Sequence, residues 1–387
     1  MVKMLRLMND FKEEKGVIIN IFITSRCNAR CLECINKTIT NNSNLSLQEL
    51  EVNAERDLKI IKEILKRHNG RLATICFYGG EPLLEPHKFI PIIENLNRNG
   101  MSGQIRYMIY TNGEYLIQFF NNYKKIAQKV WLYAVSIDGD EIQHNRFRRG
   151  TDLKRIEENL KFLKKNYWGN VLMWSTLREE QSLLNCFEEF LRLYEDGLVN
   201  HFFWHWVETQ EEFRNFPEYF NNYTNDLRII VKSYIEKLKM GILLPIAHLN
   251  ELILYLITRK ERRHTACGAE LDTNYDLVGG EILACVDIPF EKGRELKRNP
   301  EKLLSLKETL GCYKCEIHFY CGGRCPLQVL CGSNKRTRQY CELLKTHTKI
   351  VEERLSEIRN ILIEKNIALQ DIYDRSAFIV RYTDVTP

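Results

Sequence analysis

The chain has 387 residues, more than the ~250 to 300 at which a single hydrophobic core usually stops growing, so more than one domain is expected. Apolar residues make up 44% and charged residues 28%, which excludes a disordered chain and is typical of a folded globular protein. The net charge of +5 comes from 56 basic and 51 acidic residues without a long basic block, so nucleic acid is not an expected partner.

No segment predicts export or membrane insertion. A signal peptide needs an uninterrupted apolar segment, but charged residues interrupt the N-terminal arm, residues 1–16. The most apolar long stretch, 241–257, contains polar residues and is shorter than the ~20 residues that a bilayer requires, so we expect a buried helix and a cytoplasmic protein. Thirteen cysteines in a reducing compartment, clustered at short spacings, indicate metal or cluster ligation rather than disulfides.

Strand and helix patterns alternate through residues 17–207. The apolar, β-branched run 17–24 predicts a strand buried on both faces, and a helix is expected over 46–68 because Ser46 and Glu49 form a capping box. Further strands are predicted near 73–78, 104–110, 130–137, 170–176 and 201–207, separated by helices at 86–98, 114–128, 152–166 and 179–195. Parallel strands need long crossovers, so this alternation predicts an α/β fold with a partial, TIM-like (β/α)6 barrel.

The remaining chain divides by composition. Residues 208–264 read as a helical bridge, and 346–387 as a C-terminal helix and tail. Between them, 265–345 holds eight of the thirteen cysteines with little apolar periodicity, which predicts a small domain ordered by metal clusters. The tail segment 377–382 alternates like a strand and suits pairing with a sheet edge, although docking on the protein's own surface is the favoured interpretation.

Three cysteines follow the first predicted strand, at Cys27, Cys31 and Cys34. A [4Fe-4S] cube normally takes four thiolates, so this triplet would leave one iron open to a substrate or cofactor. A structural zinc site, or unrelated core thiols, is the alternative.

The triplet is accompanied by polar and glycine motifs at three further strand ends. These are Gly79-Gly80-Glu81-Pro82, Thr111-Asn112-Gly113 and Ser136-Ile137-Asp138-Gly139. The combination resembles the radical S-adenosylmethionine (SAM) enzymes. The resemblance implies that the open iron binds the methionine moiety of SAM and that a 5'-deoxyadenosyl radical abstracts hydrogen from the substrate. It also implies cofactor contacts by Gly79, Gly80, Glu81, Asn112, Ser136 and Arg148. Glu33 departs from the family pattern, in which the residue before the third cysteine is usually aromatic.

A second set of cysteines has an ordered spacing near the C-terminus. Cys267, Gly280 and Cys285 precede the run Cys312-x2-Cys315-x5-Cys321-x3-Cys325, which Cys341 follows. This order resembles the SPASM domain, which holds two auxiliary [4Fe-4S] clusters. The resemblance assigns Cys312, Cys315, Cys321 and Cys341 to the distal cluster, and Cys267, Cys285 and Cys325 to the nearer one, giving three clusters in all. For the fourth ligand of the nearer cluster, three readings stay open: His264 or another protein group, Cys331, or an open iron that binds a substrate thiolate. A zinc ribbon is the structural alternative.

Two further side chains are candidates for proton transfer. His201 and His205 alternate on one strand and share a face, which would line the substrate cavity if it points into the barrel. Asp287 follows Cys285 by two residues and is a second candidate base. Cys76 and Cys186 lie in apolar patterns and are expected to be core residues.

The resemblance favours a maturase that modifies a ribosomally made peptide or a protein side chain, forming a thioether, a carbon-carbon or carbon-oxygen crosslink, or an oxidised side chain. An anaerobic sulfatase-maturing enzyme that makes formylglycine is the alternative, and a non-catalytic iron-sulfur electron-transfer protein is the alternative of another class. Expected partners are the peptide and a reductant such as flavodoxin or ferredoxin. Because only 16 residues precede the first strand, a leader would be bound by a separate protein, by the barrel itself or by the C-terminal tail. No membrane partner is expected.

Overall fold

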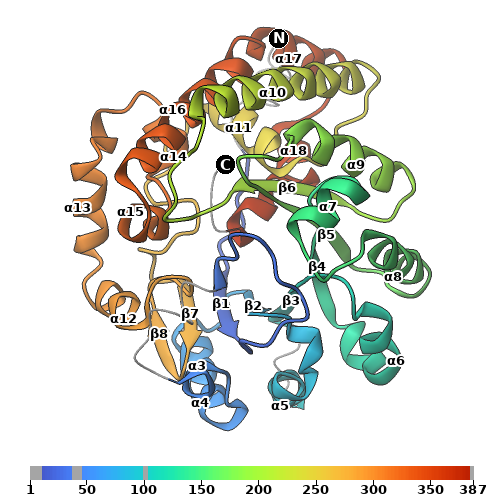
Figure 1. The fold of residues 1–387 in the computed structure, drawn as a ribbon, viewed down its shortest axis with the longest axis vertical. Coiled ribbons are helices and arrows are strands. Elements are labelled where there is room, and N and C mark those ends of the chain that lie inside the picture. Colours follow the sequence, from blue (N-terminus) through green and yellow to red (C-terminus); the bar gives the residue numbers. More distant parts are fainter. Residues whose placement is uncertain (1–10, 37–45, 99–102, 384–387) are drawn as a thin grey trace.

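The computed structural model describes residues 11–36, 46–98 and 103–383, so most of the expected N-terminal arm, 1–10, lies outside the described residues. One sheet in the order β6-β5-β4-β3-β2-β1-β7-β8 organises the molecule (Figure 1). Its strands are β1 (Val17–Phe22), β2 (Ala73–Tyr78), β3 (Ile105–Thr111), β4 (Val130–Ser136), β5 (Asn170–Leu177), β6 (His201–Trp206), β7 (Asn274–Val278) and β8 (Glu281–Leu283). Neighbours from β1 to β6 pair in parallel, which confirms the expected α/β partial barrel.

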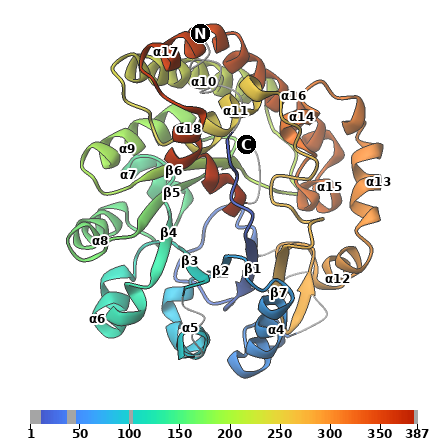
Figure 2. The ribbon, with the colours of Figure 1, turned by 180° about the vertical axis from the view of Figure 1, so that it is seen from behind.

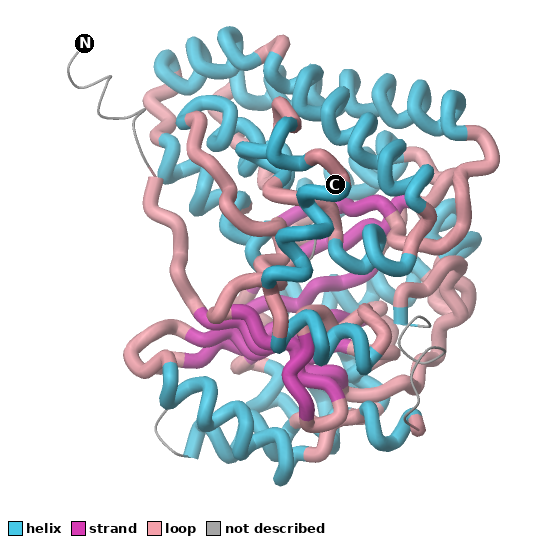
Figure 3. Tube along the Cα trace, turned by 90° about the vertical axis from the view of Figure 1, so that its left-hand side faces the viewer, coloured by secondary structure: helices cyan, strands magenta, loops and turns pink. Residues whose placement is uncertain are grey.

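Helices surround this sheet, which forms a continuous band between them in side view (Figure 3). Those of the barrel are α3 (Leu47–Leu50), α4 (Ala54–Arg67), α5 (Ile90–Arg98), α6 (Leu116–Ala127), α7 (Glu141–Phe147), α8 (Leu153–Asn166) and α9 (Leu183–Glu195). Those that follow are α10 (Phe216–Lys239), α11 (Ala247–Thr258), α12 (Phe290–Arg298), α13 (Glu301–Thr309), α14 (His318–Cys321), α15 (Pro326–Cys331), α16 (Asn334–Glu352), α17 (Leu355–Glu364) and α18 (Leu369–Arg375). In the part of the chain that the structure describes, none of these helices has the length and apolarity to cross a membrane.

The prediction of a single helix over 46–68 is wrong in one respect, because the segment forms two helices, α3 and α4. The capping box of Ser46 and Glu49 forms at the start of α3, as predicted. Glu51 then turns to extended backbone and its carboxylate accepts hydrogen bonds from the Ser25 amide, at 2.9 Å, and from Lys88 Nζ, at 2.7 Å. A tertiary contact with the loop after β1 therefore overrides the helical propensity of this stretch.

The cysteine-rich region extends the barrel sheet. Strand β7 pairs in parallel with β1, and β8 pairs antiparallel with β7. Across the first of these pairs, Asn20 Nδ2 donates to Asp276 Oδ1 at 2.7 Å, and the other oxygen of Asp276 accepts from the Val286 amide at 2.8 Å. The sheet thereby fixes the segment that carries Cys285 next to the first strand of the barrel.

The C-terminal tail fills the barrel from the end opposite to the strand C-termini. Residues Ala377–Tyr382 form a short 3-10 helix, η4, and not the strand-like segment that their alternation predicts. Ile379 and Val380 are fully buried in the apolar cluster of the barrel interior, which also contains Cys76. Phe378 contacts Trp131 and His201, at the starts of β4 and β6. In Figure 2, the red segment that follows α18 lies on the inner side of the curve formed by strands β1 to β6. The alternation of apolar residues in 377–382 therefore reflects burial inside the barrel. Cys76 is a core residue, as expected.

Candidate functional site

One cavity of about 370 Å³ lies at the C-terminal ends of the barrel strands, where parallel barrels carry their sites. Its walls come from both halves of the chain. Of the residues predicted from sequence, it is lined by Cys27, Cys31, Cys34, Gly79, Gly80, Asn112, Ser136, Arg148, His205, Cys267, Cys285, Asp287 and Cys325. Glu81 and the remaining predicted cysteines, Cys312, Cys315, Cys321 and Cys341, do not line it.

The loop that carries Cys27, Cys31 and Cys34 is tied to the opposite side of the barrel. The amide of Arg30 donates to Arg149 O at 2.6 Å, and the amide of Leu32 donates to Phe147 O at 2.9 Å. Arg178 Nε donates to the Leu32 carbonyl at 2.7 Å. These bonds shape the loop so that its three thiols face one cavity.

Gly79 and Gly80 are required by the close approach of two backbone segments. At Gly79, with φ +141°, a Cβ would lie 2.5 Å from the Thr24 carbonyl oxygen, and at Gly80 a Cβ would lie 2.1 Å from that of Arg26. The amides of Gly80 and Glu81 donate to these two carbonyls at 2.7 and 2.8 Å. The glycines thus let the end of β2 support the cysteine loop, in addition to lining the cavity.

Glu81 joins three loops from a fully buried position. Its carboxylate accepts hydrogen bonds from the amides of Leu83 and Asn112 and from Thr111 Oγ1, at 3.0, 2.7 and 2.8 Å. Burial outweighs these donors and raises the pKa of Glu81 to about 7. Asn112 in turn donates from Nδ2 to Asn28 Oδ1 at 2.7 Å, within the cysteine loop. Glu81 therefore organises the cavity wall, and its direct contact with a cofactor stays a prediction.

Asp138 holds two cationic side chains at the cavity. It is fully buried, and its Oδ2 lies 2.9 Å from both Arg148 Nε and Arg178 Nη1. Burial alone would raise the pKa of Asp138, but the two guanidinium groups hold it below its usual range. Arg148 also donates from Nη2 to Thr176 Oγ1 at 3.2 Å. This network orients the arginine that the family resemblance places against the cofactor.

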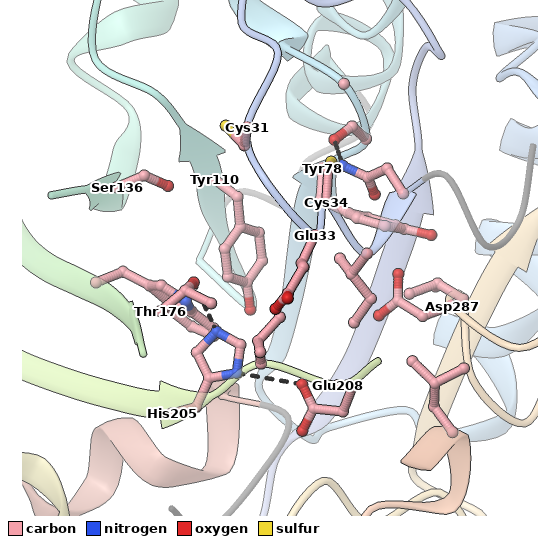
Figure 4. A pocket seen from close by; sticks show the side chains of 18 of the residues that line it. Cys31, Glu33, Cys34, Tyr78, Tyr110, Ser136, Thr176, His205, Glu208 and Asp287 are labelled. Carbon is pink, nitrogen blue, oxygen red and sulfur yellow. Dashed lines mark hydrogen bonds and ion pairs between the residues drawn. The ribbon is translucent and has the colours of Figure 1, made fainter. Parts of the chain in front are cut away.

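A histidine-carboxylate pair lies on the same wall (Figure 4). His205 Nε2 is 2.9 Å from Thr176 Oγ1, and its Nδ1 is 3.3 Å from Glu208 Oε2. His201 shares the inward face of β6, as expected, but lies at the other end of the strand and packs against Phe378. Burial lowers the pKa of His201 to about 3. Of the two histidines, only His205 lines the cavity.

Several polar residues that line the cavity were not predicted from the sequence, among them Glu208, Thr176, Arg178 and Asp276. Three of them share one signal, because Thr176 is near the end of β5 and Arg178 and Glu208 follow β5 and β6 closely. A polar residue at the C-terminal end of a barrel strand is a candidate site residue even without a motif.

The nearer set of cysteines forms the wall that faces the triplet. Cys267, Cys285 and Cys325 line the cavity and border a small apolar cluster that includes Ala284 and Leu327. Asp287 is also buried there and points into the cavity (Figure 4). Among the alternatives for a fourth ligand, Cys331 packs beside the same apolar cluster but does not line the cavity. His264 bonds through Nδ1 to the Thr265 carbonyl at 2.7 Å and borders a neighbouring cavity.

Comparison with known families identifies the barrel. The model of the Radical SAM superfamily matches residues 21–181, from β1 to the loop after β5. Residues 21–181 of the chain belong to the radical SAM superfamily. Its motifs at Cys27, Cys31 and Cys34, at Gly79 and Gly80, and at Ser136 all lie within the matched segment.

Several relatives of this radical SAM protein are informative. A "Cysteine-type anaerobic sulfatase-maturating enzyme" of Clostridium novyi is 27% identical over 151 residues, which is 36% of this chain and 38% of the relative, so the match spans about two fifths of that protein. The solved structure "Native anSMEcpe with bound AdoMet" has a TM-score of 0.67 at 19% identity and covers 89% of this chain and 98% of its own. SuiB of Streptococcus suis bound to the precursor peptide SuiA has a TM-score of 0.53 at 15% identity, covering 84% of this chain and 74% of its own. At these identities the structural matches establish the fold.

The cysteines of this radical SAM protein fit the clusters that its sequence implies. All thirteen are free of disulfides. Burial raises the pKa of the Cys27 thiol, and Glu81, Cys31 and Cys34 add to this effect, so the triplet is close enough to interact electrostatically. Burial raises the pKa of Cys312 to about 11, with added contributions from its distal partners Cys321, Cys341 and Cys315. Among the described residues no three His, Cys, Asp or Glu side chains converge on a single-ion site, whereas a four-iron cube takes its thiolates on different irons.

Glu33 occupies the position at which an aromatic residue is usual in radical SAM enzymes. Its backbone is left-handed, with φ +49°, and its side chain extends from the cysteine loop into the cavity (Figure 4). Aromatic rings nevertheless line the same cavity: Tyr78, Tyr110 and Trp174. The Tyr110 and Trp174 rings meet edge to face, with centroids 5.3 Å apart. The aromatic surface of this site therefore comes from the strands rather than from the cysteine loop.

Proposed function

We propose that this radical SAM protein is a maturase that abstracts hydrogen from a peptide or a protein side chain and couples the removal to a crosslink or another oxidative modification. One observation carries the proposal. A single cavity has Cys27, Cys31 and Cys34 on one wall and Cys267, Cys285 and Cys325 on another. A substrate in it would contact the site of hydrogen abstraction and an electron acceptor at the same time.

In this proposal, Cys27, Cys31 and Cys34 hold the SAM-binding [4Fe-4S] cluster, and Gly79, Gly80, Asn112, Ser136 and Arg148 border SAM. When bound, the reduced cluster supplies the electron that cleaves SAM and yields the 5'-deoxyadenosyl radical. The distal and nearer cysteine sets hold two auxiliary [4Fe-4S] clusters, with the fourth ligand of the nearer one among Cys331, His264 and an open position. In this proposal, the cluster held by the nearer set would bind a substrate thiolate or take up the electron that the substrate gives up.

The protein's own side chains position the substrate and handle its proton. Asp138 supports this role because it lies 2.9 Å from Arg148 Nε and holds the direction of the guanidinium. In this proposal, His205, which is buried and hydrogen-bonded to Thr176, accepts a proton from the substrate, and the neighbouring carboxylate of Glu208 stabilises the resulting imidazolium. Asp287 is the second candidate base, on the opposite wall.

The first test is SAM cleavage. Protein reconstituted anaerobically with iron and sulfide is reduced, either chemically or with flavodoxin or ferredoxin, and mixed with SAM. Release of 5'-deoxyadenosine supports the proposal. If clusters assemble and none is released, the non-catalytic electron-transfer function is favoured instead.

The second test identifies the substrate. The candidate is the peptide encoded by a small open reading frame beside the gene, with or without a separate leader-binding protein. A loss of two hydrogens in its mass supports a crosslink, and tandem mass spectrometry distinguishes a thioether from a carbon-carbon or carbon-oxygen bond. No change in mass and no exchange of hydrogen with SAM would exclude that peptide.

Conversion of a sulfatase cysteine or serine to formylglycine is the second candidate. It is favoured by the likeness to the sulfatase-maturating relative and by Asp287, a buried acid in the cavity wall. A cysteine-containing sulfatase peptide is the probe, and an aldehyde trapped by a hydrazide is the positive result. If that peptide is unchanged while the neighbouring peptide is modified, the maturase function stands alone.

A further inference from the structure

A carboxylate of the cysteine loop stands in the cavity without a cationic partner of its own. Glu33 lines the cavity, and its side chain points into it (Figure 4). No ion pair or hydrogen bond joins this carboxylate to any other residue that the structure describes. Its charge acts on Arg214, but that arginine is paired with Glu180 at 2.5 Å. The protein therefore leaves the Glu33 carboxylate open to whatever enters the cavity.

The backbone holds Glu33 in this position. The left-handed conformation, with φ +49°, is uncommon for a residue with a long side chain, so tertiary contacts must maintain it. The peptide unit that joins Leu32 to Glu33 is fixed by Arg178, whose Nε donates to the Leu32 carbonyl at 2.7 Å. Arg178 is 5% exposed and lies 2.9 Å from Asp138, and the Leu32 amide donates to Phe147 O at 2.9 Å. The loop therefore sets the direction of the side chain, and the carboxylate itself is not needed to hold the loop.

The buried arginines of the cavity are engaged elsewhere. Arg148 and Arg178 both lie 2.9 Å from the same oxygen of Asp138. A substrate that fills the cavity would remove water from Glu33, and burying a carboxylate without a partner is costly. The substrate itself must therefore bring the positive charge that offsets this cost.

We propose that Glu33 is a specificity-determining residue that binds a lysine or arginine side chain of the peptide substrate. This inference rests on the proposed function, because it takes the cavity to hold a peptide. A cation beside the carboxylate offsets the loss of water, whereas an acidic side chain would meet a like charge. An aromatic residue is usual at this position in radical SAM enzymes, so a carboxylate here is not a general requirement for binding SAM.

The charge of the whole protein works against such a preference, which makes the preference diagnostic. The net charge is +5 at pH 7, so the overall field attracts acidic peptides more than basic ones. A preference for basic peptides would therefore come from a local carboxylate and not from the average charge of the surface.

The test uses the full chain, reconstituted with iron and sulfide and loaded with SAM, after its iron content has been measured. It is offered two pools of random octapeptides, one with Lys and Arg but no Asp or Glu, and one with the reverse. Mass spectrometry quantifies the peptides that the protein retains. Wild type should retain the basic pool at least about tenfold more than the acidic pool. Glu33→Gln should abolish this preference, and Glu33→Lys should reverse it.

Glu63→Gln is the matched control. Glu63 is an exposed residue of α4 that does not line the cavity, and its substitution changes the net charge by the same amount. The control should keep the basic preference, and an equal loss in the two glutamine variants would overturn the inference. SAM affinity is measured without peptide, because SAM also carries cationic groups. If Glu33→Gln weakens SAM binding as much as it weakens the peptide preference, the carboxylate serves the cofactor, and the inference is overturned.

A measurement on wild type decides the matter if the variants do not assemble their clusters. A carbodiimide joins a carboxylate to an amine as an amide and takes up the released water as a urea. A lysine-containing peptide bound as proposed should therefore be recovered as an amide at Glu33, and amides found only at other carboxylates overturn the inference. If wild type retains neither pool, the proposed function is overturned as well, whereas retention without a basic preference overturns the role of Glu33 alone.

Discussion

The two cavity walls that carry cysteines are built in different ways. Cys27, Cys31 and Cys34 share one loop that follows a single strand, and neighbouring loops only tie that loop in place. The opposite wall collects Cys267, Cys285 and Cys325 from separate segments around β7, β8 and α15. The first wall can therefore be predicted from the sequence, because its cysteines form one local motif. The second wall cannot, because it depends on the pairing of β7 with β1.

The walls also differ in polarity. The barrel wall is polar, with the buried ion pairs of Asp138 and the bonds of Glu81. The wall of the nearer cysteines rests on an apolar cluster around Ala284, Ile288 and Leu327. Because unpaired polar groups in a buried network are costly, substitutions on the barrel wall should have the larger effects.

The largest effect is expected for Cys34→Ala. Removing one ligand of the SAM-binding cluster should lower 5'-deoxyadenosine release by at least about 100-fold, since losing even an outer-shell partner of a metal site costs 10- to 100-fold. Cys76→Ala, a buried core cysteine outside the cavity, is the control and should retain cleavage. Normal cleavage by Cys34→Ala would show that the triplet is structural.

Asp138→Asn should destabilise the fold by about 3 to 5 kcal/mol, because it leaves Arg148 and Arg178 buried beside a neutral amide. The pKa of Asp138 is lowered in the folded state, so its stabilisation is present above the unfolded pKa and is lost as pH falls through the folded one. Denaturant unfolding of wild type and variant at several pH values measures this.

Asp140→Asn is the matched control, since Asp140 only caps α7 through the Gln143 amide. Asparagine caps a helix about as well, so the change should be under about 1 kcal/mol. Equal losses in the two variants would show that the ion pairs of Asp138 contribute little.

The difference between the two walls also explains which parts of the fold and of the site could be predicted from the sequence. Strand positions, the triplet and the glycine motifs were predictable because each depends on local pattern. The break of the helix at Glu51 was not predictable, because it depends on a tertiary contact with Lys88. The form of the tail segment 377–382 was not predictable either, because the same alternation of residues occurs in a strand and in this buried 3-10 helix. Glu208 and Thr176 carry no motif, and only the strand ends bring them to His205.

Glu81→Gln should remove one contribution to the pH dependence of stability. Burial raises the pKa of Glu81 from 4.5 to about 7, so the folded state binds the proton more tightly than the unfolded chain. Its contribution is complete below 4.5 and is lost as pH rises through about 7, which amounts to about 3 kcal/mol. Relative to the permanently neutral variant, wild type should therefore lose stability as pH rises between these values, as denaturant unfolding would show.

Glu85→Gln is the control for that experiment, because the pH dependence of stability that Glu85 contributes has the opposite direction. Burial alone would raise the pKa of Glu85, but hydrogen bonds from Lys88 and Thr24 lower it. Wild type should therefore gain stability over Glu85→Gln as pH rises. The same slope in both variants would contradict the assignment for Glu81.

The smallest effect on SAM cleavage is expected for Cys285→Ala, because Cys285 lies on the wall across from the triplet. Release of 5'-deoxyadenosine without a peptide should change by less than about threefold, while the bound iron falls by about four atoms, the content of one cube. Cys331→Ala sharpens the result: if Cys331 is the fourth ligand, iron falls in the same way, and if the position is open or held by another group, iron is unchanged. A collapse of cleavage in Cys285→Ala would mean that the two walls do not act separately and that the nearer cysteines support the SAM site itself.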